Sequence, residues 1–343
     1  MREAAPRAAG PREAGPPGRG RPAAASLPRP VIEQLVRAAA AAPSMHNTQP
    51  WRFRVRDEGR LIELLADPQR QLPHSDPDGR AVHIACGAAL FNLRLAAAVA
   101  GREAVARLLP DPASPLLLAR VRFAGPYRAG HSERELYAAI WRRHTNRQPF
   151  SDRPVPPGVL ADLAAAAKLE GAILHFPGHG EAARLLHLAG DAELNQLADP
   201  AYRAELSRWA GGQGGRDGIP ATALGPVPAG SVAPVRDFTP WQPTAVRSAR
   251  FEASPQLAVL SVRHGGRAGW LRAGQALQRV LLTATTAGVA ASPITSPLET
   301  GDQWLVRDPR SGIERPQMIL RLGYGPPVPK SPRRPVTDIL DPS

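Results

Sequence analysis

The spacing of apolar residues along the chain predicts a protein that mixes helices and strands. An amphipathic helix is expected over 31–42, and it should end there because Pro43 disfavours helical geometry in the residue before it. Residues 51–55 alternate large apolar and basic side chains, which is typical of a half-buried strand, and 61–65 is the expected neighbour. The same reasoning gives a helix at 159–169 and strands at 173–176, 258–262 and 317–322.

A long helical segment occurs twice. When the chain is shifted by 187 residues, segment 79–104 falls on 266–291, and 11 of the 26 positions are identical. Alanine is abundant and inflates this number, but three glycine pairs are retained as well: Gly79/Gly266, Gly87/Gly274 and Gly101/Gly288. The last pair suits the C-terminal cap of a helix. Two copies at this spacing predict a duplicated domain, in effect a dimer within one chain.

Composition sets the expected boundaries. Residues 1–30 are rich in Pro, Gly, Ala and Arg without periodicity, so we expect a disordered tail. The first half of the duplicated body is expected over 31–130 and the second over 131–343. Within the second half, 210–244 is a Gly- and Pro-rich insertion without apparent structure, which is typical of either a lid or disorder. Its aromatic residues favour a lid.

The net charge of +13 suggests a nucleic-acid partner, but the residues that carry it argue against one. Only two of the 43 basic residues are lysines, and arginine is abundant throughout, which indicates a compositional bias. No basic stripe with interleaved aromatic residues is present, so we expect no nucleic acid. The single cysteine, Cys86, is expected to be buried and fits a reducing compartment. Without an apolar run of about 18 residues or a signal peptide, we expect a cytoplasmic protein without membrane contact.

Two polar segments carry the candidate chemistry. The loop 43–51 has the sequence Pro-Ser-Met-His-Asn-Thr-Gln-Pro-Trp, and 143–147 has the sequence Arg-His-Thr-Asn-Arg. Arg143 and Arg147 are four residues apart, so we expect them on one face of a helical turn, with the Thr145 hydroxyl between them. Such a set suits a phosphate dianion, although an exposed basic turn is the alternative. Because each half supplies one segment, we predict one composite site between the halves.

Individual residues of the first loop allow narrower expectations. Asn47 and Gln49 carry donors and acceptors that match the mixed polar edge of a flavin ring, whereas loop capping is the alternative for Asn47. His46 is expected to face solvent, with an acid–base role as the alternative. Trp51 is expected in the core. The histidines lack partners at metal-ligand spacing, so no metal is expected.

These segments resemble the nitroreductase family of flavin enzymes. The resemblance rests on Ala-Pro-Ser-x-x-Asn-x-Gln-Pro-Trp at 42–51, the Gly-x-Ala-Leu helix, Gly-Val-Ala-Ala-Ser-Pro-Ile at 288–294 and the basic C-terminal tail. It covers about residues 31–340, and the tandem layout is most similar to the single-chain, Acg-like branch. It implies an α+β fold: mixed, mainly antiparallel sheets flanked by helices, with two tandem halves forming a pseudo-dimer and FMN between them.

The resemblance also implies roles for individual residues. The FMN phosphate and ribityl chain would be held by Arg143, Thr145 and Arg147, with Arg333 and Arg334 closing on the phosphate. From the other half, the ring and ribityl hydroxyls would be reached by Pro43, Ser44, Met45, Asn47 and Gln49. The segment that runs over the ring near N5 would be Pro293, Ile294, Thr295 and Ser296. The family commonly has Glu-Gly in place of Thr295-Ser296, so this chain departs from the pattern there.

The implied function is NAD(P)H-dependent hydride transfer through FMN to a nitroaromatic, a quinone or a similar small-molecule acceptor. The protein would act as a monomer that contains its own pseudo-dimer. Flavin chemistry needs few catalytic side chains, and no nucleophile–base arrangement is evident, so no catalytic residue is assigned. The alternative is an FMN-binding protein that sequesters the flavin under the insertion, with little or no turnover.

Overall fold

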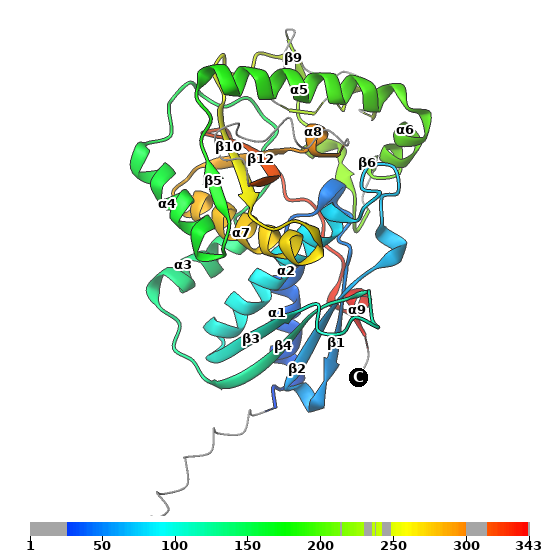
Figure 1. Ribbon diagram of the computed structural model, residues 1–343, viewed down its shortest axis with the longest axis vertical. Coiled ribbons are helices and arrows are strands. Elements are labelled where there is room, and N and C mark those ends of the chain that lie inside the picture. Colours follow the sequence, from blue (N-terminus) through cyan, green and yellow to red (C-terminus); the bar gives the residue numbers. More distant parts are fainter. Residues whose placement is uncertain are drawn as a thin grey trace, which may run out of the picture.

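The computed structural model describes residues 26–212, 215–229, 235–236, 238–241, 248–299 and 314–341 of the chain. Two sheets lie apart from each other, and two long helices, α2 (Arg80–Val99) and α7 (Gly266–Thr286), pack together between them (Figure 1). The fold is the expected α+β mixture. Of the tail predicted at 1–30, residues 1–25 lie outside the described residues.

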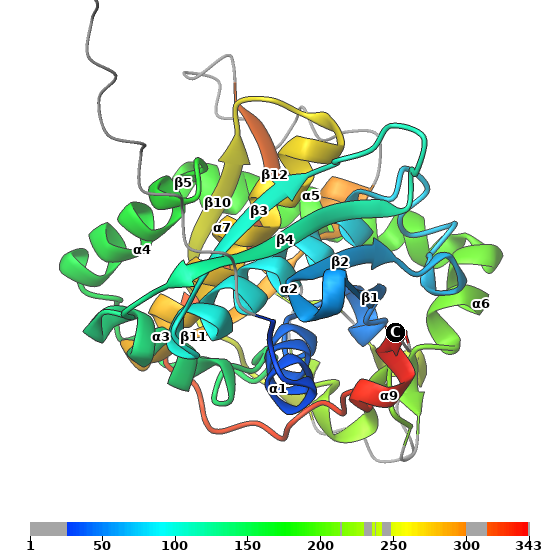
Figure 2. The same ribbon diagram turned by 90° about the horizontal axis from the view of Figure 1, so that it is seen from below.

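Sheet A contains the strands of the first half and one strand from the C-terminal end. Its order is β13-β1-β2-β4-β3, and its strands are β1 (Trp51–Arg56), β2 (Leu61–Ala66), β3 (Arg102–Leu108), β4 (Leu117–Pro126) and β13 (Leu340–Asp341). Helices α1 (Arg29–Ala40) and α2 cover one face, and the other face is open in Figure 2. Trp51 and Phe53 are fully buried, whereas the alternating Arg52 and Arg54 pair with Asp341. One-sided burial therefore explains the predicted alternation in β1.

Sheet B is covered on both faces. Its order is β11-β12-β10-β5, and its strands are β5 (Ile173–His175), β10 (Gln256–Val262), β11 (Ala290–Ile294) and β12 (Arg315–Gly323). Ala258 and Leu260 pack toward α4 (Pro157–Leu169) and α7, whereas Leu257 and Val259 pack toward α5 (His179–Ala198). Burial on both sides explains why β10 is apolar without alternation.

The two sheets repeat one arrangement. The order along the chain is α1-β1-β2-α2-β3-β4 in the first half and α4-β5-β10-α7-β11-β12 in the second. In space, β1-β2-β4-β3 of sheet A corresponds to β5-β10-β12-β11 of sheet B, and these strand pairs are all antiparallel. This correspondence is what a duplicated domain would produce.

One glycine pair of the sequence repeat, Gly87 and Gly274, lies where α2 and α7 cross. A Cβ atom added to Gly87 would lie 2.2 Å from the carbonyl oxygen of Leu271, and one added to Gly274 would lie 2.0 Å from that of Ile84. Ile84 and Leu271 are themselves a pair at the 187-residue spacing. Each helix therefore presents the same positions to the other, which is the pattern of a contact about a two-fold axis.

The large difference between the halves is an insertion in the second. Strands β1 and β2 are joined by a short turn, Asp57–Gly59, whereas β5 and β10 are separated by residues 176–255. The described residues of the predicted insertion at 210–244 are not structureless, because they contain short strands, and two helices precede them at 179–207. The elements not yet named are α3 (His131–Ile140), α6 (Pro200–Ser207), α8 (Ser296–Glu299), α9 (Val336–Ile339), β6 (Ala210–Gly212), β7 (Ile219–Pro220), β8 (Val227–Pro228) and β9 (Ser248–Ala249).

Two local expectations are adjusted by the structure. Helix α1 ends at Ala40, two residues before the predicted end, with Ala41 as its C-cap. Helix α2 is long and apolar enough to cross a membrane, contrary to the expectation that no such segment exists. However, 83% of the apolar window of α2 is buried inside the protein, as in a core helix. Cys86, on this helix, is fully buried as predicted.

Candidate functional site

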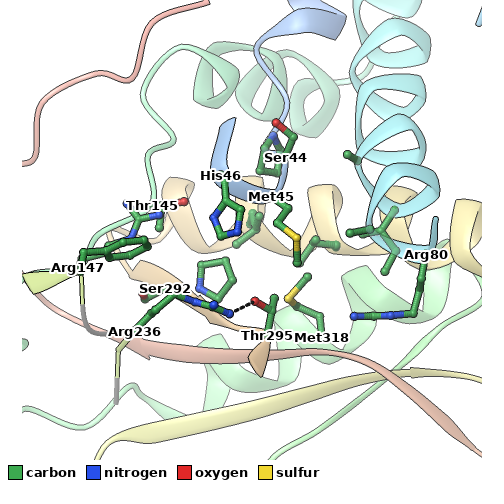
Figure 3. Close-up of a pocket in the computed structure, with 18 residues that line it drawn as sticks. Ser44, Met45, His46, Arg80, Thr145, Arg147, Arg236, Ser292, Thr295 and Met318 are labelled. Carbon is green, nitrogen blue, oxygen red and sulfur yellow. Dashed lines mark hydrogen bonds between the residues drawn. The ribbon is translucent and has the colours of Figure 1, made fainter. Parts of the chain in front are cut away.

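A cavity opens where the two halves meet (Figure 3). It measures about 870 Å³, counting the part open to solvent, and it lies between the loop after α1, the first turns of α2, the middle of α7 and the strands β11 and β12. Many of the residues predicted for the site line it. They are Pro43, Ser44, Met45, Thr145, Arg147, Pro293 and Thr295. The structure thus brings together segments that are about 250 residues apart in the chain.

The loop after α1 has an unusual backbone. His46, Asn47 and Gln49 have φ angles of 47°, 56° and 52°, in the left-handed region that non-glycine residues rarely adopt. The Ser44 hydroxyl accepts a hydrogen bond from the Gln49 amide at 2.9 Å, which closes the loop on itself. Backbone strain of this kind persists only where the surroundings hold it in place, and it occurs often at functional sites.

Asn47 and Gln49 hold the loop in place from outside the cavity. Asn47 Nδ2 donates to the carbonyl oxygens of Gly218 (2.9 Å) and Pro332 (3.1 Å). Gln49 Nε2 donates to the Arg216 carbonyl (3.0 Å), and its Oε1 accepts from the Arg334 amide (2.8 Å). The two side chains therefore bind the insertion and the C-terminal tail, and neither lines the cavity as the predicted flavin contact would require.

The expectation that His46 faces solvent is wrong. The side chain is buried and lines the cavity, and its Nε2 atom has no hydrogen-bond partner among the described residues. Burial, reinforced by the nearby Arg236, lowers the pKa of His46 to about 3. The imidazole is therefore neutral at physiological pH. No signal in the loop sequence indicates that α2 and the insertion enclose it.

Arg143 and Arg333 converge beside the cavity, at the end of α1. Arg143 Nη2 lies 3.5 Å from the Ala41 carbonyl oxygen, and Arg333 Nη2 lies 3.3 Å from the same oxygen and 3.2 Å from that of Ala42. Arg143 is buried and Arg333 is half-buried, both Nε atoms are buried without a partner among the described residues, and no carboxylate there pairs with either. Burial and the proximity of Arg333 lower the pKa of Arg143 to about 9, and burial lowers that of Arg333 to about 10. Both remain cationic at neutral pH.

Arg147 contacts the insertion and does not join Arg143 and Arg333. The segment is extended, because Thr145 bridges to Ala291 and places 143–147 alongside β11. The expectation that Arg143 and Arg147 share one face of a helical turn is therefore wrong. Arg147 Nη1 donates to the Ala223 carbonyl at 2.9 Å, and its guanidinium lies 5.4 Å from the ring centre of Phe238. Burial lowers the pKa of Arg147 to about 10.

A buried ion pair that the sequence did not reveal fixes the insertion to the cavity wall. Arg236, which lines the cavity, lies 2.7 Å from Glu299 Oε1 and also hydrogen bonds to the Tyr202 hydroxyl and, at 3.4 Å, to Thr295 Oγ1. Arg236 lowers the pKa of Glu299 against the effect of burial, so this carboxylate stays charged. The one available signal was that Glu299 follows Thr295 by one helical turn.

Ile294, Ser296 and Arg334, like Asn47, Gln49, Arg143 and Arg333, do not line the cavity. Ile294 packs in the core between sheet B and α5, and Ser296 is buried at the start of α8. Arg334 pairs with Asp67 at 3.4 Å and donates to the Asp338 carbonyl at 2.9 Å, so it ties the tail to the first half. Strand alternation explains Ile294, because its neighbours Pro293 and Thr295 face the cavity on the opposite side.

Comparison with known proteins identifies the class. The sequence profile of the nitroreductase family matches residues 23–78 and 140–324. A protein of Mycobacterium tuberculosis H37Rv named "Putative NAD(P)H nitroreductase Rv3131" is 36% identical over 319 residues, covering 90% of this chain and 91% of that protein. From the same organism, "Putative NAD(P)H nitroreductase acg" is 32% identical over 316 residues, covering 90% of this chain and 95% of that protein. The chain therefore belongs to the nitroreductase family, as its motifs indicated.

Among solved structures, the chain is similar to a nitroreductase with bound FMN from Desulfitobacterium hafniense. The two are 14% identical, the TM-score is 0.38, and the match covers 61% of this chain and 98% of that chain.

Proposed function

We propose that this protein is an FMN-dependent NAD(P)H oxidoreductase with one flavin site between its two halves. The observation that carries the proposal is the pair Arg143 and Arg333, buried and half-buried, which has no carboxylate partner among the described residues and two buried, unsatisfied Nε atoms. Two cations that lie close together and are largely shielded from water repel each other, so the pair favours an anion. A phosphate dianion supplies both the charge and the acceptors, and FMN carries one at the end of its ribityl chain.

The cavity beside this pair fits the rest of the cofactor. Pro43, Ser44 and Met45 from the first half would cover the ring, and Pro293 and Thr295 from the second half would run along it. The Thr145 hydroxyl would face the ribityl chain. Asn47, Gln49 and Arg334 would act indirectly, because they hold the loop and the tail that form the walls.

Bound at this site, FMN would supply the redox chemistry that links NAD(P)H to an acceptor such as a nitroaromatic or a quinone. The protein's part is to orient the reactants and exclude water. Arg147 places positive charge on one side of the cavity, which favours the electron-rich reduced ring, whereas the charge of Arg236 is balanced by Glu299. His46 would meet the ring as a neutral imidazole, so it is not expected to deliver a proton at neutral pH.

A second function is supported by the insertion. Arg236 and Phe238 line the cavity, and the buried Arg236–Glu299 pair fixes this part of the insertion in place. An insertion that stays closed would prevent a nicotinamide from stacking on the flavin, and the protein would then sequester FMN with little turnover. Both functions fit a cytoplasmic monomer that contains its own pseudo-dimer.

An anaerobic absorption spectrum distinguishes the two functions. A flavin band that bleaches with NADPH or NADH supports the oxidoreductase. A band that persists with both but bleaches with dithionite supports sequestration, and Arg236→Ala should then restore bleaching by the nicotinamide. Purified protein that shows no flavin band, even after FMN is added, would exclude both functions.

The phosphate pair can be tested separately from catalysis. Replacing Arg143 or Arg333 by Gln removes a charge-assisted contact, so the dissociation constant of FMN should rise by about 10- to 100-fold for each variant. Riboflavin lacks the phosphate, and its affinity should remain unchanged. Arg142→Gln is the matched control, since Arg142 is the exposed neighbour of Arg143. If the affinities for FMN and riboflavin fell equally, the pair would not hold the phosphate.

A further inference from the structure

The cavity has a second cationic end that the proposed FMN site does not use. Arg80, the first residue of α2, lines the cavity and is only 4% exposed. In Figure 3 it lies beside Met318, on the opposite side of the cavity from Arg147 and Arg236. The phosphate pair, Arg143 and Arg333, does not line this cavity. Arg80 is therefore a separate cationic group that belongs to none of the contacts described above.

Arg80 is poorly partnered for a buried guanidinium. Its Nη1 donates to the Gln317 carbonyl oxygen at 2.7 Å, and no carboxylate lies within 4 Å of it in the described part of the chain. Asp76 interacts with it only at longer range, because the Asp76 oxygens accept the amides of Ala81 (2.8 Å) and Val82 (2.9 Å) at the start of α2. Burial consequently lowers the pKa of Arg80 from its ordinary value, although the group remains charged.

An arrangement of this kind is costly unless something pairs with the charge. A guanidinium has five N–H donors, and a buried charge is normally compensated by a counter-charge. Arg236, at the other side of the cavity, has Glu299 as its partner. Arg80 is more fully buried than Arg236 but has no such partner, and it borders the cavity, so a ligand anion could supply the missing acceptors.

The wall that leads to Arg80 defines the rest of the ligand. Between the loop after α1 and Arg80, the cavity is lined by apolar side chains: Met45, Ile84, Leu277, Leu281 and Met318. Apolar surface with one charged group at its end selects a flat apolar body that carries an anion. We propose that Arg80 binds the carboxylate of an aromatic electron acceptor. This proposal rests on the proposed function, because it names the acceptor class of the same site.

The chain contains a matched control for Arg80. Arg267 occupies the corresponding position in the second copy of the repeat, 187 residues further on, and lies in the first turn of α7. It does not line the cavity; its Nε donates to His83 Nε2 at 2.9 Å, and its Nη2 donates to the Pro115 carbonyl. Arg267→Gln therefore removes the same charge from an equivalent helix end, away from the cavity.

The test is equilibrium binding of 4-nitrobenzoate and of the neutral 4-nitrobenzamide, measured by calorimetry on protein whose FMN content is determined by absorbance. The wild-type protein should prefer the benzoate. Arg80→Gln should lower the affinity for 4-nitrobenzoate by about 10- to 100-fold and should change the affinity for 4-nitrobenzamide by less than about threefold. Arg267→Gln should change neither, and Arg80→Lys should be intermediate because charge remains without the fork.

Several outcomes would overturn the proposal. The wild-type protein could bind neither compound or show no preference for the benzoate, or Arg80→Gln could weaken both compounds equally. If Arg80→Gln lowered the affinity for FMN more than the affinity for riboflavin, the FMN phosphate would lie at Arg80. A shift of the flavin midpoint potential in this variant, with benzoate binding unchanged, would place Arg80 against the flavin ring. Failure of the proposed function is seen independently, as protein that takes up no FMN.

Discussion

The two copies of the long helix, α2 and α7, are alike where their glycines touch each other and differ at some of the positions that line the cavity. At the crossing, Gly87 and Gly274 each fit against the backbone of the other helix. At two positions that line the cavity the paired residues differ strongly. Ala85 lines it, whereas the second copy has the exposed Arg272. Leu281 lines it as well, whereas the first copy has Arg94, which pairs with Glu170 at 3.0 Å.

This difference is what we expect if a duplicated frame carries a single site. The crossing fixes how the halves sit together, and it tolerates little change because backbone meets backbone. The flanking positions are free to change. Beside the cavity, Ala85 and Leu281 are small or apolar, whereas their counterparts in the other copy are arginines. Arg80 and Arg267 illustrate the point most directly, since the same residue at the same repeat position faces the cavity in one copy and His83 in the other.

The largest expected effect comes from the shared crossing. Gly87→Val or Gly274→Val would place side-chain atoms within about 2 Å of a backbone carbonyl, so the helices must separate. We expect each variant to lower the free energy of unfolding by more than about 3 kcal/mol, measured by chemical denaturation.

Gly190→Ala is the control for this effect. Gly190 lies on α5, and a Cβ there would meet nothing within 4 Å, so alanine should stabilise by about 0.5–1 kcal/mol through helix propensity. If either crossing variant is as stable as wild type, or if one glycine tolerates valine and the other does not, the crossing is not the symmetric contact described above.

The second contrast is the loop that follows the first helix of each half. In the first half it carries the buried His46, whereas in the second half α4 is followed almost directly by β5. The pKa of His46 is lowered to about 3 in the fold, so between pH 6.5 and 3 the unfolded chain binds this proton more strongly. Stability is therefore lost as the pH falls below 6.5, by about 2 kcal/mol from this group at pH 5.

His46→Asn isolates this effect. Asparagine tolerates the left-handed backbone of position 46, so the variant should match wild type at pH 7.5 and should be about 2 kcal/mol more stable at pH 5. Denaturation curves at both pH values provide the measurement. His144, whose pKa burial and nearby Arg143 lower to about 4, should still produce an acid loss in the variant. An unchanged pH dependence would contradict the burial of His46.

The sequence predicts the frame better than the site, for physical reasons. Strand alternation, helix spacing and the glycine pairs are local signals, and they located β1, β2, α2 and α7 closely. The motif residues Pro43, Ser44, Met45, Pro293 and Thr295 also line the cavity. Arg236 and Arg80 were missed because their importance depends on which distant segment encloses them. Likewise, Asn47 and Gln49 have polar groups that suit either a ligand or a loop anchor, and only the positions of Gly218 and the tail decide between these roles.

The smallest expected effect tests whether the two halves end their long helices in the same way. Gly101 and Gly288 follow α2 and α7 with φ angles of 79° and 71°, and an added Cβ would meet nothing closer than the Tyr127 carbonyl oxygen, 3.8 Å from Gly101. The cost of alanine is thus conformational rather than steric, and it should be about 1 kcal/mol at each site. Thermal unfolding of Gly101→Ala, Gly288→Ala and the double variant measures this cost.

Because the two glycines share no contact, the effects of the two substitutions on the free energy of unfolding should add. A cost at one site alone would mean that the repeated glycines serve different purposes, and the equivalence of the halves would then be limited to the crossing.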